Sequence, residues 1–273
     1  MTRTINARIA AILIAVAATV GGVYWYTRHA PAPAPSAAPP VAQPQPDATP
    51  AGPVVRYPVP EPEIADEDEE ALPPALPDLQ ESDPLALESL LTLYPDPLVA
   101  ALVKPEFVIP RIVATIDNLP RDRLNAHAMP VKPVPGLFAV DTQGDVVTLS
   151  DANAARYQVY VDAFVAADTA QLVSQYHRFY PLFQRAYREL GDPDAYFNDR
   201  LVDVIDHMLQ APEAQAPIAL VKPRTAWEFA NPEWQSQSIG HRLMLRIGSA
   251  HAARIKAKLG ELRAALVAEA PVE

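Results

Sequence analysis

Candidate acid–base and metal-binding residues fall together in the segment FNDRLVDVIDH, residues 197–207. Asp199, Asp203 and Asp206 are spaced i, i+4 and i+7, which places three carboxylates on one side of a helix. His207 follows four residues after Asp203. Carboxylates and an imidazole bind divalent cations or divide general acid and base roles. The pattern also suits a solvated helix side or a structural polar network. Because no second set of ligands accompanies it, no metal and no cofactor is predicted.

Polar residues near the predicted ends of helices are candidates for binding rather than for catalysis. They occur in RIVATIDNLPRDRL (111–124), in LSDANAARY (149–157) and beside the acidic row. Side chains at such places cap helices, and in some proteins they line a cleft. Capping is the favoured interpretation. The candidates of this kind are Asp117, Asn118 and Arg156. Asn198 and Arg200, beside the acidic row, are further binding candidates, and the alternative for Arg200 is a local pair on its own helix.

The distribution of charge predicts a basic C-terminal helix on an acidic body. Residues 241–263 contain six basic residues and one acid, Glu261, whereas residues 84–240 carry a net negative charge. Such a helix can dock an anionic partner, such as a lipid or glycan phosphate or an acidic protein face. Alternatively, it neutralises its own domain. The candidate binding residues in it are Arg242, Arg246, Arg254, Lys256 and Lys258.

The elements that must position these residues are mostly helices. Apolar residues at helical spacing, with capping residues and prolines at the ends, predict a compact, mainly α domain over residues 84–270. One small β-hairpin is expected from residues 137–140 and 146–149, joined by a five-residue loop that contains a glycine. Pro181 is expected to kink its helix. The predicted helices span residues 84–94, 96–103, 106–119, 151–166, 169–190, 195–210, 232–247 and 249 onward.

The helix predicted over residues 169–190 is the most aromatic segment of the chain. Its large apolar residues recur at i, i+4, i+7, i+8, i+11 and i+15, which forms one continuous face. Such a face is typical of a protein core, and the alternative is that it lines a groove for a ligand. The residues on it are Leu172, Tyr176, Phe179, Tyr180, Phe183 and Tyr187.

Composition excludes several classes of function. The 273 residues include no cysteine, which excludes disulfides, thiol nucleophiles, iron–sulfur clusters and cysteine-type zinc sites. The 22 basic and 33 acidic residues leave a net charge of −11, which argues against a nucleic-acid-binding protein. The sequence contains no GxSxG, HExxH, Walker or GxGxxG motif. The 31 prolines, against nine glycines, indicate that part of the chain lies outside a packed core.

The N-terminal region has the pattern of a membrane anchor. Residues 9–26, IAAILIAVAATVGGVYWY, contain no charge, and a helix of that length spans about 27 Å, close to the hydrocarbon thickness of a bilayer. Arg3 and Arg8 precede this segment. The positive-inside bias therefore predicts a cytoplasmic N-terminus over residues 1–8 and a transmembrane helix over residues 9–27. The alternatives are a cleaved signal peptide and a buried helix.

A linker is predicted over residues 28–83. Sixteen prolines between residues 31 and 84, interleaved with alanine, are typical of a disordered or polyproline II-like segment. Residues 61–83 carry ten acidic residues and no base. We interpret the segment as a spacer with a solubilising acidic run. A second hypothesis is an acidic flap that competes for the basic residues 241–263.

A combination of stretches gives the chain a family resemblance. They are LPDLQESDP (76–84), RIVATIDNLPRDRL (111–124), VKPVPG (131–136), LSDANAARY (149–157) and FYPLFQRAYRELGDPDAYFNDRLVDVIDHML (179–209). Over roughly residues 72–268 the chain resembles a bacterial family catalogued as domain of unknown function 3014. The resemblance implies an uncharacterised envelope protein, mostly of Gram-negative bacteria, and it implies no activity.

These observations predict a single-pass protein of the inner membrane, with a cytoplasmic N-terminus and a periplasmic helical domain. The expected role is an interaction or scaffold module of the cell envelope. The expected partners are the lipid bilayer, through residues 9–27, and an envelope protein or an anionic glycan or lipid. No nucleic acid is expected. The alternatives are an envelope hydrolase or a small-ligand sensor that uses the polar residues around Asp199–His207.

Overall fold

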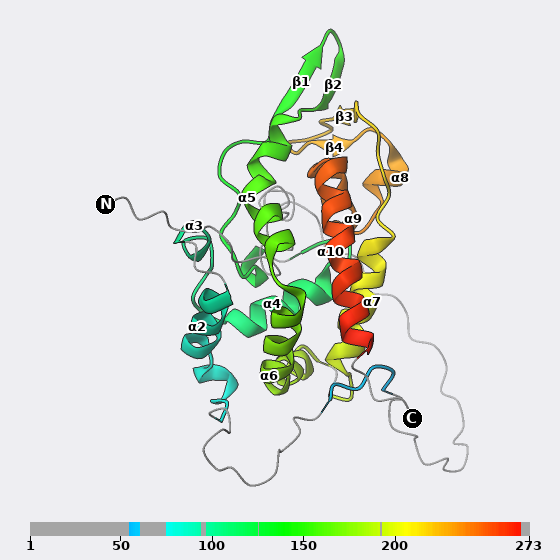
Figure 1. The fold of residues 1–273 in the computed structure, drawn as a ribbon. Helices are drawn as coiled ribbons and strands as arrows, with labels where there is room; N and C mark the ends of the chain where they lie inside the picture. Colours follow the sequence, from blue (N-terminus) through cyan, green and yellow to red (C-terminus); the bar gives the residue numbers. More distant parts are fainter. Residues whose placement is uncertain (1–54, 61–74, 94–96, 125, 192, 269–273) are drawn as a thin grey trace, which may run out of the picture.

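The computed structural model describes residues 55–60, 75–93, 97–124, 126–191 and 193–268. These residues form a mainly helical domain with a small β-hairpin, as predicted (Figure 1). A search of this part of the chain finds no helix with the length and apolar character needed to cross a membrane. The predicted N-terminus (1–8), transmembrane helix (9–27) and most of the predicted linker lie outside the described residues.

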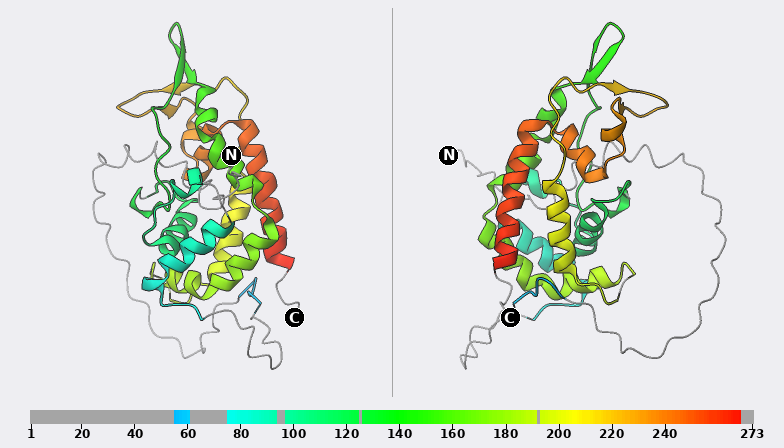
Figure 2. Two further views of the ribbon diagram at one scale, coloured as in Figure 1. Left: turned by 60° about the vertical axis from the view of Figure 1, so that its left-hand side comes forward. Right: turned by 90° about the vertical axis from the view of Figure 1, so that its right-hand side faces the viewer.

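The described helices are α2 (Asp83–Leu93), α3 (Pro97–Ala100), α4 (Val108–Asn118), α5 (Ala152–Ala166), α6 (Thr169–Arg188), α7 (Phe197–Leu209), α8 (Pro232–Gln235), α9 (Ile239–Arg246) and α10 (Ser249–Ala268). The long C-terminal helix α10 packs against α5, α6, α7 and α9 (Figure 2). On the other side of the core, α4 packs against α2, α6 and α7. The helices therefore enclose one main core.

Helical periodicity explains how this core forms. One face of α4 is apolar because its buried aliphatic residues recur every three or four positions; they are Val108, Ile109, Ile112, Val113 and Ile116. The apolar stripe on α10 behaves in the same way, since Ile255, Leu262 and Leu266 are buried. Leu259, the fourth residue of that stripe, is half-buried and packs against the core.

The aromatic face of α6 belongs to this core, as predicted. Phe179 is buried, and the other aromatic residues of the face are half-buried against the core. The ring of Phe183 stacks on the fully buried ring of Phe197 in α7, with 5.8 Å between ring centroids. Tyr176 and Tyr187 pack against Phe197 at centroid distances of 6.4 and 5.3 Å. The helix continues through Pro181 to Arg188.

Capping side chains fix the starts of two helices. Asp168 caps α6 by accepting a hydrogen bond of 2.8 Å from the backbone N–H of Gln171. The start of α4 is capped from another helix, because the carboxylate of Asp83 accepts hydrogen bonds from Phe107 N–H (2.6 Å) and Val108 N–H (2.7 Å). Phe107 has φ 54°, a left-handed conformation that bulky residues rarely adopt. The Asp83 contacts hold this conformation and tie α2 to α4.

The helix predicted over residues 232–247 is divided in two. Asn231 caps α8, but α8 ends at Gln235, and Ser238 caps a second helix, α9. The division brings the start of α9 against the end of α4, where Ile239 N–H and Gly240 N–H donate to the carbonyls of Arg121 (2.8 Å) and Leu119 (3.0 Å). A side chain at Gly240 would meet that Leu119 carbonyl, so glycine permits this close approach.

The helix predicted over residues 96–103 is also shorter than expected. Only α3 is helical, because the chain then pairs with a distant segment. Val103 forms an isolated antiparallel bridge with Val131. Lys104 N–H donates to the carbonyl of Pro130, and Lys132 N–H donates to that of Leu102, each at 2.8 Å. These bonds replace the intrahelical ones.

The hairpin is present, but its strands and turn differ from the prediction. They are β1 (Val140–Gln143) and β2 (Val146–Leu149), and the five-residue loop is a two-residue turn, Gly144-Asp145. Gly144 has φ 59°, as the first position of a type II′ turn requires. The hairpin projects from the helices (Figures 1 and 2). A second pair, β3 (Leu220–Val221) and β4 (Glu228–Phe229), was not predicted; it packs against β2 in a separate apolar cluster.

Two segments of the predicted linker contact the domain. Tyr57, in residues 55–60, and Leu76 are half-buried against the core. Leu79 is buried in the short 3₁₀-helix η2 (Leu79–Glu81), and Asp78 pairs with Arg185 of α6 at 2.9 Å. The linker prediction over residues 28–83 therefore does not hold for these segments, because each contributes a large apolar side chain to the domain.

Candidate functional site

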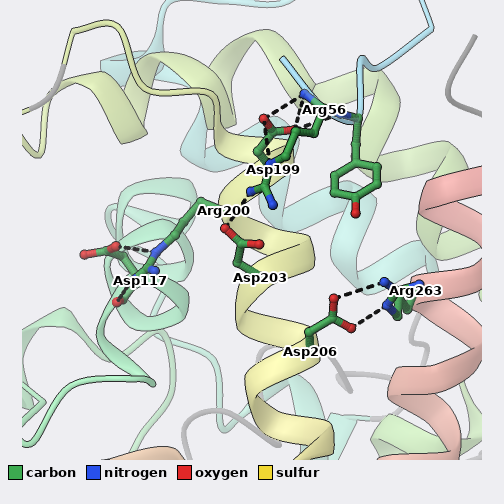
Figure 3. Close-up of polar contacts among 8 residues, drawn as sticks. Arg56, Asp117, Asp199, Arg200, Asp203, Asp206 and Arg263 are labelled. Atoms are coloured by element: carbon green, nitrogen blue, oxygen red, sulfur yellow. Dashed lines mark hydrogen bonds and ion pairs between the residues drawn. The ribbon is translucent and has the colours of Figure 1, made fainter. Parts of the chain in front are cut away.

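The three carboxylates of α7 lie along one side of the helix, as predicted, and arginines from outside α7 pair with them (Figure 3). The guanidinium of Arg56 lies 2.6 Å from Asp203 and 3.7 Å from Asp199. The guanidinium of Arg263, on α10, donates two hydrogen bonds to Asp206, one of them at 3.0 Å. The row therefore joins α7 to an N-terminal segment and to the C-terminal helix.

Asp199 binds the backbone of the N-terminal segment. Its carboxylate accepts hydrogen bonds from the backbone N–H of Arg56, at 3.0 Å, and of Tyr57, at 2.8 Å. The Asp199 side chain is only 13% exposed. Hydrogen bonds to an ionised acceptor are stronger than neutral ones, and partial burial strengthens them further. The Asp199 carboxylate therefore holds the backbone of Arg56 and Tyr57 in place.

Two neighbours of Asp199 complete this contact. Asn198 donates a hydrogen bond of 2.8 Å to the Tyr57 carbonyl and accepts one of 3.0 Å from the Tyr176 hydroxyl. The Tyr196 hydroxyl accepts a hydrogen bond of 2.8 Å from the backbone N–H of Val59. We call the contact of residues 56–59 with the start of α7 the tether clamp; its α7-side residues are Tyr196, Asn198, Asp199 and Asp203. Most of its bonds hold backbone atoms of residues 56–59.

The clamp predicts a specific effect of removing its carboxylates. In the double variant Asp199→Ala/Asp203→Ala, amide hydrogen exchange at Arg56 and Tyr57 should rise by roughly tenfold or more, because charge-assisted hydrogen bonds of about 1.5–3 kcal/mol are lost. Global stability should change little, since the Arg56 side chain, which both carboxylates bind, is half-exposed. Asp151→Ala is the matched control, because Asp151 is exposed and makes no side-chain capping bond. Unchanged exchange at these two amides in a folded double variant would contradict the clamp.

Asp117 and Arg200 form a second tie, between α4 and α7. Arg200 Nε lies 2.9 Å from a carboxylate oxygen of Asp117, and another guanidinium nitrogen donates to the Asp117 carbonyl at 2.8 Å. Arg121 binds the other carboxylate oxygen at 2.5 Å. Asn118 donates to the carbonyl of Ala114 within its own helix. Asp117 and Arg200 thus serve packing, and the capping role predicted for Asp117 is replaced by this ion pair.

Arg156 pins the segment that leads into the hairpin. Its guanidinium donates to the carbonyls of Pro135 (3.1 Å) and Gly136 (2.9 Å) and to the Asn153 side chain (3.1 Å). Asn153 is fully buried and bonds both backbone groups of Ala139. These contacts are structural, in keeping with the favoured interpretation of the polar residues.

His207 is separated in function from the acidic row. Asp203 pairs with Arg56, while a hydrogen bond of 2.7 Å joins His207 Nε2 to the Ser238 hydroxyl. The His207 ring stacks on that of His241, with 4.0 Å between centroids. Burial, and then the nearby His241 and Arg200, lower the pKa of His207. A neutral His207 therefore suits the contact between α7 and α9.

This lowered pKa predicts a pH dependence of stability. Because the folded-state pKa of His207 lies below its unfolded value of about 6.5, the unfolded chain binds the proton more tightly. The contribution of neutral His207 is complete above about pH 6.5 and is lost as the pH falls below that value. Urea unfolding between pH 7.5 and 5.5 should therefore show a smaller loss of stability in His207→Gln than in the unchanged protein. Equal losses in both proteins would refute this origin.

The basic residues of the C-terminal region bind groups of their own domain. Arg246 lies over the rings of Phe138 and Phe229, at 5.7 and 5.4 Å from the centroids, and burial lowers its pKa. The other contacts are Arg242 with the Gln235 and Asp122 carbonyls, Arg254 with Asp162, Lys256 with Glu213 and the Ala211 carbonyl, and Lys258 with Glu261 and Thr169. Self-neutralisation, the second of the two sequence interpretations, describes this region. Most of the acidic flap of the other hypothesis lies outside the described residues.

The arrangement suits packing and docking more than acid–base chemistry. Each carboxylate of the α7 row accepts hydrogen bonds from a cationic or backbone donor. Across the part of the chain that the structure describes, no three histidine, aspartate or glutamate side chains gather as metal ligands. Arg56, Tyr57 and Tyr196 were not singled out from the sequence, and Arg263 was placed only within the basic region 241–263. A signal was present, since Arg56 and Tyr57 are the only basic and only aromatic residue between Pro31 and Pro84.

These features define a helical domain whose N-terminal segment is docked on α7. The model of the family described as a protein of unknown function, DUF3014, matches residues 108–263. The chain therefore belongs to the DUF3014 family. No curated protein and no solved structure matches the chain.

Proposed function

We propose that this protein is a membrane-anchored interaction module of the cell envelope. The apolar segment 9–26, with Arg3 and Arg8 before it, supports a single-pass anchor with residues 28–273 in the periplasm. The proposal rests on one structural observation above all, the tether clamp. Residues 56–59, which follow the anchor in sequence, are held at one defined place on the domain.

The clamp supports a role in holding the domain for interaction with a partner, rather than catalysis by the three carboxylates of α7. A chain fixed at residues 56–59 sets the place on the domain from which the residues before Arg56 lead toward the proposed membrane. The carboxylates that a hydrolase would use are engaged in holding Arg56, Tyr57 and Arg263. The opposite end of the domain, with the projecting hairpin, is then free to meet an envelope partner (Figure 1).

The topology is testable because the chain has no cysteine. Single cysteines at Thr2 and at the exposed Asp151 are the only thiols in Thr2→Cys and Asp151→Cys. A membrane-impermeant maleimide added to spheroplasts should label Asp151→Cys directly and Thr2→Cys only after permeabilisation. The reverse pattern, or recovery of the intact chain in the soluble fraction, would overturn the anchor.

The interaction role needs a second experiment. Crosslinking of the intact protein in its native envelope, followed by mass spectrometry, should capture a partner that a chain of residues 1–83 alone does not. A result in which the intact protein captures nothing beyond this control would contradict an interaction module while leaving the anchor intact.

A further inference from the structure

The core of the domain contains a cavity of about 180 Å³. Seven helices contribute to its wall: α2, α4, α5, α6, α7, α9 and α10. Protein interiors are usually packed as densely as organic crystals, and their voids seldom exceed a water molecule. A space of this size is therefore a feature to be explained.

The wall of the cavity is almost entirely hydrocarbon. Typical wall residues are Ile109 of α4, Phe179 of α6, Val204 of α7 and Leu262 of α10, all of them buried. An apolar cavity offers water no hydrogen-bond partners, so it stays dry. A cavity of about 150 Å³ with such a lining, in another protein, binds benzene.

The few polar residues of the wall already have partners. Ser89 of α2 donates a hydrogen bond of 2.6 Å to Gln175 of α6, and Tyr176 donates to Asn198. Ser89 and Gln175 are half-buried, as are Leu90 and Leu93 of α2. Half-buried residues thus form part of the wall where α2 meets α6, and there one hydrogen bond links two neutral side chains. An apolar chain can enter there without displacing a charge.

We propose that this cavity is a binding site for a single alkyl chain, the apolar end of a fatty acid or a lipid. The chain would enter between α2 and α6, with its polar head at the Ser89–Gln175 edge. The volume fits a short alkyl segment or a benzene-sized group, and the wall supplies the dispersion contacts that an empty space forgoes. The site is independent of the proposed interaction role, because it requires neither an anchor nor a protein partner.

Photocrosslinking tests this site in the full-length chain, reconstituted in phospholipid nanodiscs. Octanoic acid with a terminal diazirine is the first probe, and phosphatidylethanolamine with a diazirine at the end of one acyl chain is the second. Labels mapped by mass spectrometry should fall on wall residues of α2, α6 and α10. Labelling by the first probe alone identifies a free fatty acid, and labelling by the second identifies a membrane lipid.

Two variants fill the cavity from opposite sides. Ala86→Phe on α2 and Val173→Phe on α6 should each reduce labelling of the wall at least tenfold, while Val159→Phe should not, since Val159 is exposed on α5 and lies outside the wall. Cooperative thermal unfolding identifies the variants that fold, and either filled variant suffices. Labels confined to residues 9–27 in the unchanged protein, or equal labelling in a folded filled variant, would overturn the proposal.

Discussion

Phe197→Ala is expected to lower the free energy of unfolding by about 3–5 kcal/mol, as truncation of a large core aromatic typically does. Phe197 is fully buried at the start of α7, and its ring contacts those of Tyr176, Phe183 and Tyr187. The ring also forms part of the cavity wall. Its removal enlarges that cavity, so the surrounding side chains cannot easily collapse to fill the added space. Equilibrium unfolding in urea measures the loss.

Two further variants make this prediction specific. Phe197→Leu restores much of the lost volume and should recover more than half of the lost stability. Val159→Ala, at a 46% exposed position, should lie within about 0.5 kcal/mol of the unchanged protein. A loss below about 1 kcal/mol for Phe197→Ala would mean that the aromatic cluster is not the centre of the core.

Asp117→Ala is expected to cost about 2–3 kcal/mol. The Asp117 side chain is 8% exposed and the Arg200 side chain 27%, so removing the carboxylate leaves a largely desolvated guanidinium with only the Asp117 carbonyl as a partner. The value lies below the usual 3–5 kcal/mol for a fully buried pair because Arg200 retains contact with solvent.

A double-mutant cycle separates the ion pair from general packing. In Asp117→Ala/Arg200→Met no desolvated unpaired charge remains at the α4–α7 contact, because Arg121, the other partner of Asp117, is exposed. The double variant should therefore be more stable than the sum of the single losses by about 1 kcal/mol or more. The exposed control Asp151→Ala should be neutral. Strict additivity of the two single losses would refute a direct interaction between Asp117 and Arg200.

The long helices are predictable because each carries a local signal. Asp168 and the aromatic face determine α6, and the stripe that includes Ile255 and Leu262 determines α10. Both signals act over neighbouring turns, so sequence alone contains them. The division of residues 232–247 is different. It depends on the contact of Gly240 with the Leu119 carbonyl, which lies far away in sequence.

The hairpin was predicted in the wrong register for a related reason. Its first strand, Val140–Gln143, consists mostly of polar residues, because the hairpin projects from the domain and few of its side chains are buried. Alternation of apolar and polar residues identifies strands that pack on a core. Such alternation is absent here. The first strand was therefore predicted on the apolar residues that precede it.

The candidate site shows the same division between local and distant signals. Helical spacing correctly placed Asp199, Asp203 and Asp206 on one side of α7. Which residues pair with them could not be predicted. Arg56 stands out as the only basic residue of its proline-rich segment, but it lies about 140 residues from Asp199 in sequence, and Arg263 lies on another helix. A carboxylate row is compatible with catalysis, metal binding or ion pairing, and only the positions of the partners distinguish these.

The tether clamp also determines how the domain would respond to mechanical load. Tension on the chain before Arg56 is transmitted first to α7, and the hydrogen bonds at Arg56, Tyr57 and Val59 bear it. The contacts of Asp78 and Asp83 are loaded only afterwards. The clamp therefore bears a pulling force before the contacts of Asp78 and Asp83 with the folded core do.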